Sequence, residues 1–172
     1  MSGTWFIGCG NMGGAMLSRW LDSGMVAETV TVIDPLLPNL AHGVRVLAEL
    51  PSTLPPPDLM MLAIKPQVLD QIVPQVAALM GVNTVLISIL AGIKLAALRE
   101  RFVAPHVIIR AVPNMPVALG RGVVALVADD QAAAEQAGLT ALMARLGLVE
   151  WMESEAQLDA VTALSGSGPA FV

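Results

Sequence analysis

The residues best suited to chemistry form a glycine-rich segment near the start of the chain. It follows a short apolar run, Thr4–Ile7, and precedes a segment with helical periodicity that begins at Asn11. A turn in this position lets the backbone approach a ligand, and the free amides at the start of the helix favour an anion. The pattern therefore predicts a site for a pyrophosphate group. Its residues, with the glycines in G-x-G-x-x-G spacing, are Ile7, Gly8, Cys9, Gly10, Asn11, Met12 and Gly13.

An acidic residue stands where a dinucleotide site needs one. Residues 30–33 read as a second strand, and Asp34 follows it, 26 positions after Gly8. A carboxylate here can accept hydrogen bonds from the ribose hydroxyls of adenosine, and it would repel a 2′-phosphate. We therefore expect NADH or NADPH as coenzyme, with Asp34 favouring NADH. The structural alternatives are an ordinary βα turn for the glycines and a solvated strand end for Asp34.

Composition narrows the class of protein. Of the 172 residues, 55% are hydrophobic and only 13% are charged, compared with about 25% charged in an average protein. This indicates elements buried on both sides, or a surface that another part of the protein covers. The net charge is −5, and the nine Lys and Arg residues are scattered, which argues against nucleic acid as a partner.

Two further observations bear on location and on redox chemistry. The apolar stretch over residues 76–93 is interrupted by Gly81, Asn83 and Thr84, so we expect no membrane span there. Cys9 is the only cysteine and cannot form an internal disulfide, which fits a cytoplasmic protein. Without a nearby partner base, we interpret Cys9 as a small residue that fills the turn and not as a catalytic thiol.

Strands and helices alternate along the chain. This predicts an α/β fold, a Rossmann-like, doubly wound and mainly parallel sheet, with the glycine turn at its carboxyl edge. Pro74 is expected to kink its helix or to shift the start. The expected strands cover residues 4–7, 30–33, 44–47, 59–64, 85–89, 107–112, 123–127 and 148–152, and the expected helices cover residues 11–23, 67–80, 94–101 and 129–145, the last capped by Asp129 or Asp130.

The character of the sequence changes after Met152. We expect residues 1–152 to form a dinucleotide-binding domain, and residues 153–172 to form a linker helix and the start of a helical second domain. The helix should run over residues 153–164 with Ser154 as its cap, and residues 165–169 should form a flexible turn. Because a new helix is expected to begin at Pro169, we interpret the chain as a fragment whose second domain is missing.

Five segments resemble pyrroline-5-carboxylate reductases in order and spacing. The two most selective are Pro-Asn-Met-Pro, which ends at Pro116, and Ser-Gly-Ser-Gly-Pro-Ala, which ends at Ala170. The segments span nearly the whole chain and cover residues 6–13, 62–67, 88–93, 109–116 and 159–171.

The resemblance implies an activity and an organisation. Members of this family transfer hydride from NAD(P)H to the C=N bond of 1-pyrroline-5-carboxylate, which gives L-proline, the last step of proline biosynthesis. Their helical domain forms a dimer and holds the small-molecule substrate. We therefore expect the catalytic residues in the missing domain, homo-oligomers of the full-length parent through that domain, and a fragment that binds coenzyme with little or no turnover.

The resemblance also assigns roles to residues. Ala63, Ile64, Lys65 and Pro66 would line the nicotinamide ribose, with the Lys65 ammonium near ribose or phosphate. The nicotinamide would lie against Leu90, Ala91 and Gly92, where Leu90 is larger than the usual residue and is expected to narrow the pocket. Asn114 would brace a turn near the reacting centre. Leu50 occupies the position of an asparagine that the family often has beside adenosine, and no metal is implied.

Two other interpretations stay open from the sequence. One is a related imine reductase or β-hydroxyacid reductase with the same glycine turn, although the two selective segments count against it. The other is a dinucleotide-sensing module without catalysis, because a fold alone does not specify a reaction.

Overall fold

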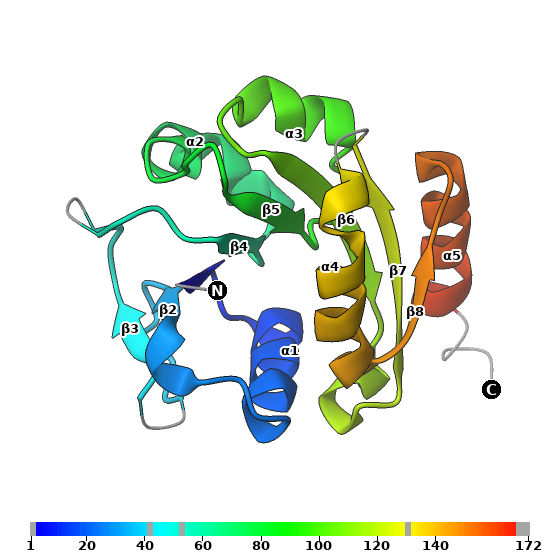
Figure 1. Ribbon diagram of the computed structural model, residues 1–172, viewed down its shortest axis with the longest axis horizontal. Coiled ribbons are helices and arrows are strands. Elements are labelled where there is room, and N and C mark those ends of the chain that lie inside the picture. Colours follow the sequence, from blue (N-terminus) through cyan, green and yellow to red (C-terminus); the bar gives the residue numbers. More distant parts are fainter. Residues whose placement is uncertain (1–2, 41–42, 52–53, 130–131, 168–172) are drawn as a thin grey trace.

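The strands of the protein form one mixed sheet (Figure 1). The computed structural model describes residues 3–40, 43–51, 54–129 and 132–167. Within these residues the sheet has eight strands in the order β3-β2-β1-β4-β5-β6-β7-β8. The strands are β1 (Thr4–Ile7), β2 (Val30–Ile33), β3 (Arg45–Leu47), β4 (Leu59–Leu62), β5 (Val85–Ser88), β6 (Val107–Pro113), β7 (Gly122–Ala128) and β8 (Gly147–Trp151).

Every neighbouring pair of these strands is parallel except β6 and β7, which are antiparallel. The order reverses at β1, which lies between β2 and β4, with Phe6 level with Val32 on one side and with Met61 on the other. Such a reversal opens a crevice at the carboxyl ends of the strands, where doubly wound proteins bind ligands. The predicted fold class is therefore confirmed.

Helices cover both faces of the sheet. Helices α1 (Asn11–Asp22) and α4 (Gln136–Met143) pack on one face, and α2 (Leu69–Ala77) and α3 (Leu95–Arg101) pack on the other. Helix α5 (Glu155–Ser167) lies on the same face as α3, over β6 and β7. Successive strand residues point to opposite faces, so Phe6 belongs to the first core and its neighbours Trp5 and Ile7 to the second.

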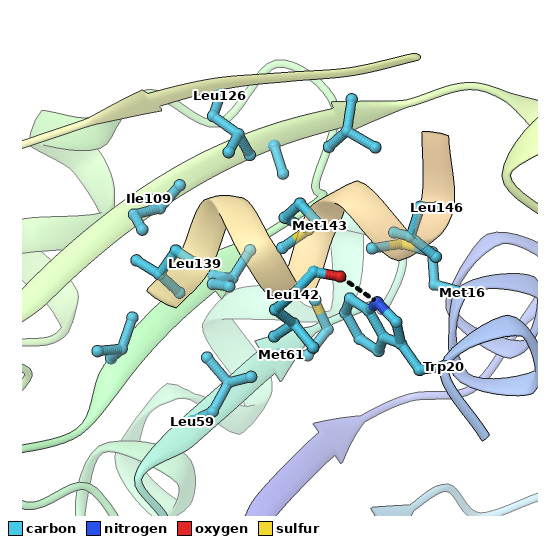
Figure 2. Packing of buried hydrophobic residues seen from close by; sticks show 14 of the residues in the cluster. Met16, Trp20, Leu59, Met61, Ile109, Leu126, Leu139, Leu142, Met143 and Leu146 are labelled. Carbon is cyan, nitrogen blue, oxygen red and sulfur yellow. Dashed lines mark hydrogen bonds between the residues drawn. The ribbon is translucent and has the colours of Figure 1, made fainter. Parts of the chain in front are cut away.

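The first core fixes the position of α1 (Figure 2). Trp20 is fully buried, its indole N–H donates to the carbonyl oxygen of Leu142 at 3.0 Å, and its ring meets Phe6 edge-to-face at 5.9 Å. Met16 and Leu17 lie on the same side of the helix, and both are fully buried. This packing holds the start of α1 at the end of β1 and thereby orients the glycine loop.

Helix α2 is shorter than predicted. The chain enters it through a 3-10 turn, Pro66–Val68, and the α-helix ends at Ala77, three residues before the predicted Met80. Pro74 lies inside the helix. Because Pro66 provides a fixed φ but no N–H, it suits the first position of such a turn.

The predicted helix over residues 129–145 is divided. A 3-10 turn, Ala132–Ala134, precedes α4, and another, Ala144–Leu146, follows it. The side chain of Asp129 does not cap α4, because it binds the guanidinium of Arg99 and accepts from the backbone N–H of Ile108 at 3.2 Å. Asp130, the alternative cap, lies outside the described residues.

Helix α5 corrects the prediction for the end of the chain. It continues through Ser167, so residues 165–167 are helical and not a turn. Each added residue contributes one backbone hydrogen bond, which offsets the roughly 1 kcal/mol that a glycine costs in a helix. The expected cap is confirmed, since the Ser154 hydroxyl accepts from the N–H of Gln157 at 3.4 Å. Residues 168 and 169 lie outside the described residues.

A helix that crosses a membrane must be long and mostly apolar. In the described part of the chain, no helix meets both requirements.

Candidate coenzyme site

The glycine loop turns sharply at the end of β1. Gly8 has φ +84°, and its N–H donates to the carbonyl oxygen of Ile33 at 2.8 Å. A Cβ at Gly8 would lie 2.8 Å from the carbonyl oxygen of Ala63 and 2.7 Å from Cγ2 of Ile64. Both the left-handed conformation and the contact with the residues that follow β4 therefore require glycine here.

The other two glycines of the motif differ in what surrounds them. A Cβ at Gly13 would lie 2.8 Å from Cβ of Ala63, so this glycine permits close packing of α1 on the end of β4. A Cβ at Gly10 would meet no atom within 4 Å. Gly10 is the N-cap of α1, no side chain caps the helix there, and its first turn carries no acidic residue. The start of α1 is thus open to an external anion, as a diphosphate requires.

A cavity of about 1200 Å³ lies beside this loop, at the carboxyl ends of β1, β2, β3 and β4. Eight of the predicted residues line it, namely Ile7, Gly8, Cys9, Gly10, Asp34, Ala63, Ile64 and Lys65. Its lining also contains Leu50, which the resemblance placed beside adenosine. The lining residues that the sequence did not point to are Ile33, Pro35, Leu36, Ala48, Glu49, Pro51, Val68, Ile72, Gln75, Ala78 and Leu79. The alignment of parallel strand ends could have identified residues 48–51, because β3 pairs with β2.

Asp34 braces the glycine loop. Its Oδ2 accepts from the backbone N–H of Cys9 at 2.8 Å, and its Oδ1 accepts from the N–H of Leu36 at 2.9 Å. The side chain is half-buried and lines the cavity. A carboxylate oxygen can accept more than one hydrogen bond, so both oxygens keep capacity for a hydroxyl of a ligand.

Cys9 is unsuited to nucleophilic chemistry. Burial, and secondarily the nearby Asp34 carboxylate, raise the pKa of the Cys9 thiol to about 11. The thiol is therefore protonated near neutral pH, whereas a nucleophilic cysteine requires the thiolate. The side chain packs against the first core, which agrees with its interpretation as a residue that fills the turn.

The remaining predicted residues lie outside the lining of the cavity. Asn11 and Met12 begin α1 next to it, together with Gly13, and Pro66 follows Lys65. Ala91 and Gly92 are exposed beyond β5. Leu90 is only 4% exposed and packs in the second core, which corrects the expectation that it narrows the pocket.

Asn114 has a bracing role, as predicted. Its side-chain Oδ1 accepts from the backbone N–H of Val123 at 2.8 Å and so closes the connection between β6 and β7.

The described ranges contain no group of three or more His, Cys, Asp or Glu residues that could hold a metal ion.

Comparison with known proteins identifies the family. The model of the family described as "NADP oxidoreductase coenzyme F420-dependent" matches residues 5–92. The chain belongs to this family. The matched residues include all of β1 except Thr4, the glycine loop, Asp34 and every residue that lines the cavity.

Within this family of NADP oxidoreductases, the chain is similar to pyrroline-5-carboxylate reductases, which confirms the resemblance found from its motifs. It is 33% identical to the Pseudomonas aeruginosa enzyme over 96% of the chain and 63% of the relative. The structure of the Coxiella burnetii enzyme is 26% identical, with a TM-score of 0.84 over 99% of this chain and 66% of that one. The Plasmodium falciparum reductase, a structure with NADP bound, has the same fold, with 20% identity and a TM-score of 0.85 over 98% of this chain and 64% of that one.

The similarity to the reductases extends beyond the family model. That model ends at residue 92, whereas the similarity to the Pseudomonas enzyme covers 96% of the chain. The chain itself spans about 63% of the length of that curated relative.

Proposed function

We propose that this chain is the coenzyme-binding part of a pyrroline-5-carboxylate reductase. In this proposal residues 1–152 form the dinucleotide-binding domain, and residues 153–172 begin a helical domain. The observation that carries the proposal is the 33% identity, over 96% of the chain, with an enzyme named for this reaction. The open start of α1 above the cavity supports a dinucleotide as the ligand.

Each part of the site would bind one part of the coenzyme. The backbone amides of residues 8–13 would donate to the diphosphate, and the missing side chain of Gly10 would leave room for it. Asp34 would accept from the adenosine ribose while it holds the loop through the N–H of Cys9. The nicotinamide half would lie along residues 63–66 and 90–92, at the carboxyl ends of β4 and β5.

The proposed reaction is the reduction of a cyclic imine. When bound, the reduced nicotinamide would supply a hydride to the C=N carbon of 1-pyrroline-5-carboxylate, whose imine nitrogen takes up a proton, and the product would be L-proline. The protein contributes by holding donor and acceptor in contact. By the resemblance, the helical domain holds the substrate and forms the dimer, so we propose that this chain alone binds coenzyme with little or no turnover. We also propose a cytoplasmic location and no role in binding nucleic acid.

Charge at the adenosine end favours NADH over NADPH in this proposal. Asp34 and Glu49 both line the cavity, and Lys65 is the only basic residue among the lining residues. A 2′-phosphate would carry close to two further negative charges into this region. Like charges at short range raise the free energy of the complex, so the two carboxylates would select against it.

Two measurements test the proposal. Calorimetric titrations with NADH and with NADPH, compared with a titration of buffer alone, should show that the chain binds a dinucleotide. If neither coenzyme binds at saturating concentration, the coenzyme site is rejected. The full-length protein, of which we propose that this chain is a part, should form proline from 1-pyrroline-5-carboxylate. Reduction of other cyclic imines or oxidation of β-hydroxyacids in its place would identify a related reductase, and binding without any turnover would identify a sensing module.

The preference for NADH is tested by Asp34→Ser. The variant should raise the affinity for NADPH relative to NADH by about tenfold, because one repulsive charge near the 2′-phosphate is removed. An unchanged ratio would refute the role of Asp34 in coenzyme choice.

A further inference from the structure

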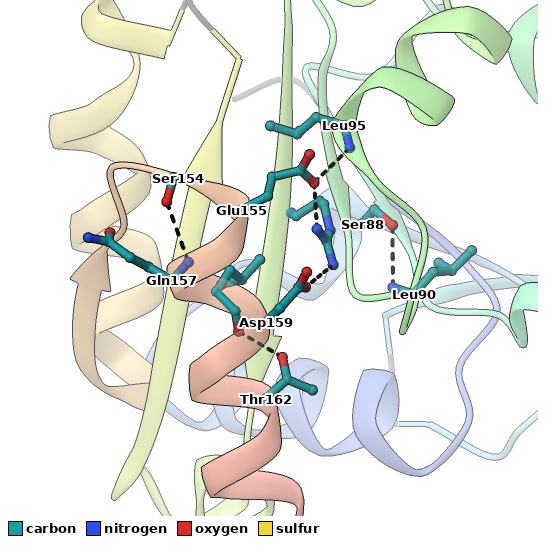
Figure 3. A network of polar contacts seen from close by, with 10 residues as sticks. Ser88, Leu90, Leu95, Ser154, Glu155, Gln157, Asp159 and Thr162 are labelled. Atoms are coloured by element: carbon teal, nitrogen blue, oxygen red, sulfur yellow. Dashed lines mark hydrogen bonds and ion pairs between the residues drawn. The ribbon is translucent and has the colours of Figure 1, made fainter.

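A buried arginine joins helix α5 to the sheet through Glu155 and Asp159, and Figure 3 shows these two partners on α5. The side chain of Arg110, on β6, is only 5% exposed. Its Nη1 lies 2.5 Å from Oε1 of Glu155 and its Nη2 lies 3.3 Å from Oδ1 of Asp159, both on α5. A buried guanidinium is costly without a charged partner. Glu155 is 25% exposed and Asp159 is 54% exposed, so Glu155 is the better-shielded and closer partner.

The same oxygen of Glu155 has a second partner. Oε1 also accepts from the backbone N–H of Leu95 at 2.9 Å, where α3 begins. One carboxylate oxygen therefore connects three elements, namely β6, α5 and the start of α3. This contact is not implied by the residue spacing, because Leu95 and Glu155 are 60 positions apart.

The contact between Glu155 and Leu95 lies at the end of the loop that the proposed function places beside the nicotinamide. Residues 90–92 lie between β5 and α3, and Leu95 follows Gly92 by three positions. At its start, the loop is held by the N–H of Leu90, which donates to the Ser88 hydroxyl at 3.3 Å. At its end, it is held by Glu155. Leu90 packs in the second core, but Gly92 has φ +75° and open space around it, so no side-chain packing fixes the backbone at Gly92 itself.

We propose that Glu155 is a positioning residue for the coenzyme site, which sets the loop of residues 90–92 from helix α5 through Leu95 and Arg110. The inference rests on the proposed function, since that function assigns this loop to the nicotinamide half. The helix that leads out of the sheet thereby determines how the reactive end of the coenzyme is held. The glycine loop and Asp34, which would hold the other half, make no contact with this network among the described hydrogen bonds.

The test compares two ligands that differ in the nicotinamide half. Affinities of this chain for NADH and for ADP-ribose are measured by calorimetry in the wild type, in Glu155→Ala and in Glu155→Gln. Glu155→Ala should lower the affinity for NADH about fivefold or more relative to the affinity for ADP-ribose. Glu155→Gln keeps an acceptor oxygen for Leu95 and should restore at least half of that loss on a logarithmic scale. Glu153→Gln, a change of an exposed residue just before α5, should leave both affinities unchanged.

The outcomes separate this proposal from the function on which it rests. If the wild type binds neither ligand, the proposed function fails and the positioning role fails with it. If the wild type binds both but Glu155→Ala leaves their ratio unchanged, or weakens both equally, only the positioning role is overturned. Should Glu155→Ala not fold, Glu155→Asp, whose shorter side chain cannot keep both contacts, takes its place with the same expected loss. Protection of the Leu95 amide from hydrogen exchange should fall in either variant, and unchanged protection would also overturn the role.

Discussion

Gly10 allows the diphosphate site to be tested separately from the stability of the fold. In Gly10→Ala the new methyl group meets no protein atom within 4 Å, and the backbone at Gly10, with φ −69° and ψ −165°, is open to any residue. The fold should lose only about 0.5–1 kcal/mol, because alanine is a poorer N-cap than glycine. The methyl group would, however, occupy the space in which we place the diphosphate.

The expected loss of affinity follows from the hydrogen bonds that the methyl group would break. Displacement of the diphosphate should remove at least one hydrogen bond to a charged oxygen, worth about 1.5–3 kcal/mol. The dissociation constant for NADH should therefore rise about 10- to 150-fold. Calorimetry gives the constant, and urea unfolding followed by fluorescence gives the stability of the same preparation.

The matched control is Gly14→Ala. Its Cβ would make only an ordinary contact, 3.5 Å from the carbonyl oxygen of Cys9, and the residue lies inside α1. This change should stabilise the fold by about 0.5–1 kcal/mol and leave the affinity for NADH within about twofold. If Gly10→Ala binds NADH as tightly as the wild type, the diphosphate does not lie over this loop and the assignment of the site is wrong.

Three further changes test other features. Gly8→Ala should destabilise the fold by about 2–4 kcal/mol in urea unfolding, because it combines a left-handed backbone with a 2.8 Å contact to the carbonyl oxygen of Ala63; a loss below about 0.5 kcal/mol would contradict this geometry. Trp20→Phe should cost about 1–3 kcal/mol through the lost hydrogen bond to Leu142, whereas Leu148→Ala, at an exposed position, should cost much less. Burial raises the pKa of the Cys9 thiol from its ordinary value of 9.0 to about 11 in the folded protein, so as pH rises the thiol ionises first in the unfolded state. The unfolded state then binds fewer protons, so stability should fall between pH 9 and 11, and this part of the decline should be absent in Cys9→Ala.

Features determined locally could be predicted from the sequence. Strand β1, the glycine turn and α1 follow one another without a break, and they were marked by an apolar run, by the spacing of the glycines and by helical periodicity, respectively. The direction of β7 was not predicted, although the short connection from Asn114 to Arg121 leaves no room for a crossover helix and so requires an antiparallel strand. The extension of α5 through Gly166 was missed because glycine and serine favour turns on average. Here these residues extend a helix whose first turns are already formed, and adding residues to a formed helix is easier than starting one.

Side-chain contacts between distant elements were beyond prediction from the pattern. Asp34 was recognised by its place after β2, but its hydrogen bond to the N–H of Cys9 depends on how two loops meet. Leu90 was expected to narrow the pocket because it lies in a segment that resembles the family's and is larger than the usual residue there, whereas its side chain is buried in the core. The contact of Glu155 with Leu95 depends on the packing of α5 against the sheet, which no local signal reports.

The strand topology also has a consequence for the order of folding. Strands β6 and β7 are joined by a short connection and pair from Pro113 and Val124 outward, so they can associate as soon as both exist. Strand β1 is synthesised first, yet one of its two neighbours, β4, begins only at Leu59. Because closing longer loops costs more entropy and slows pairing, we expect the β6–β7 hairpin to assemble early and the crevice beside β1 to be completed late.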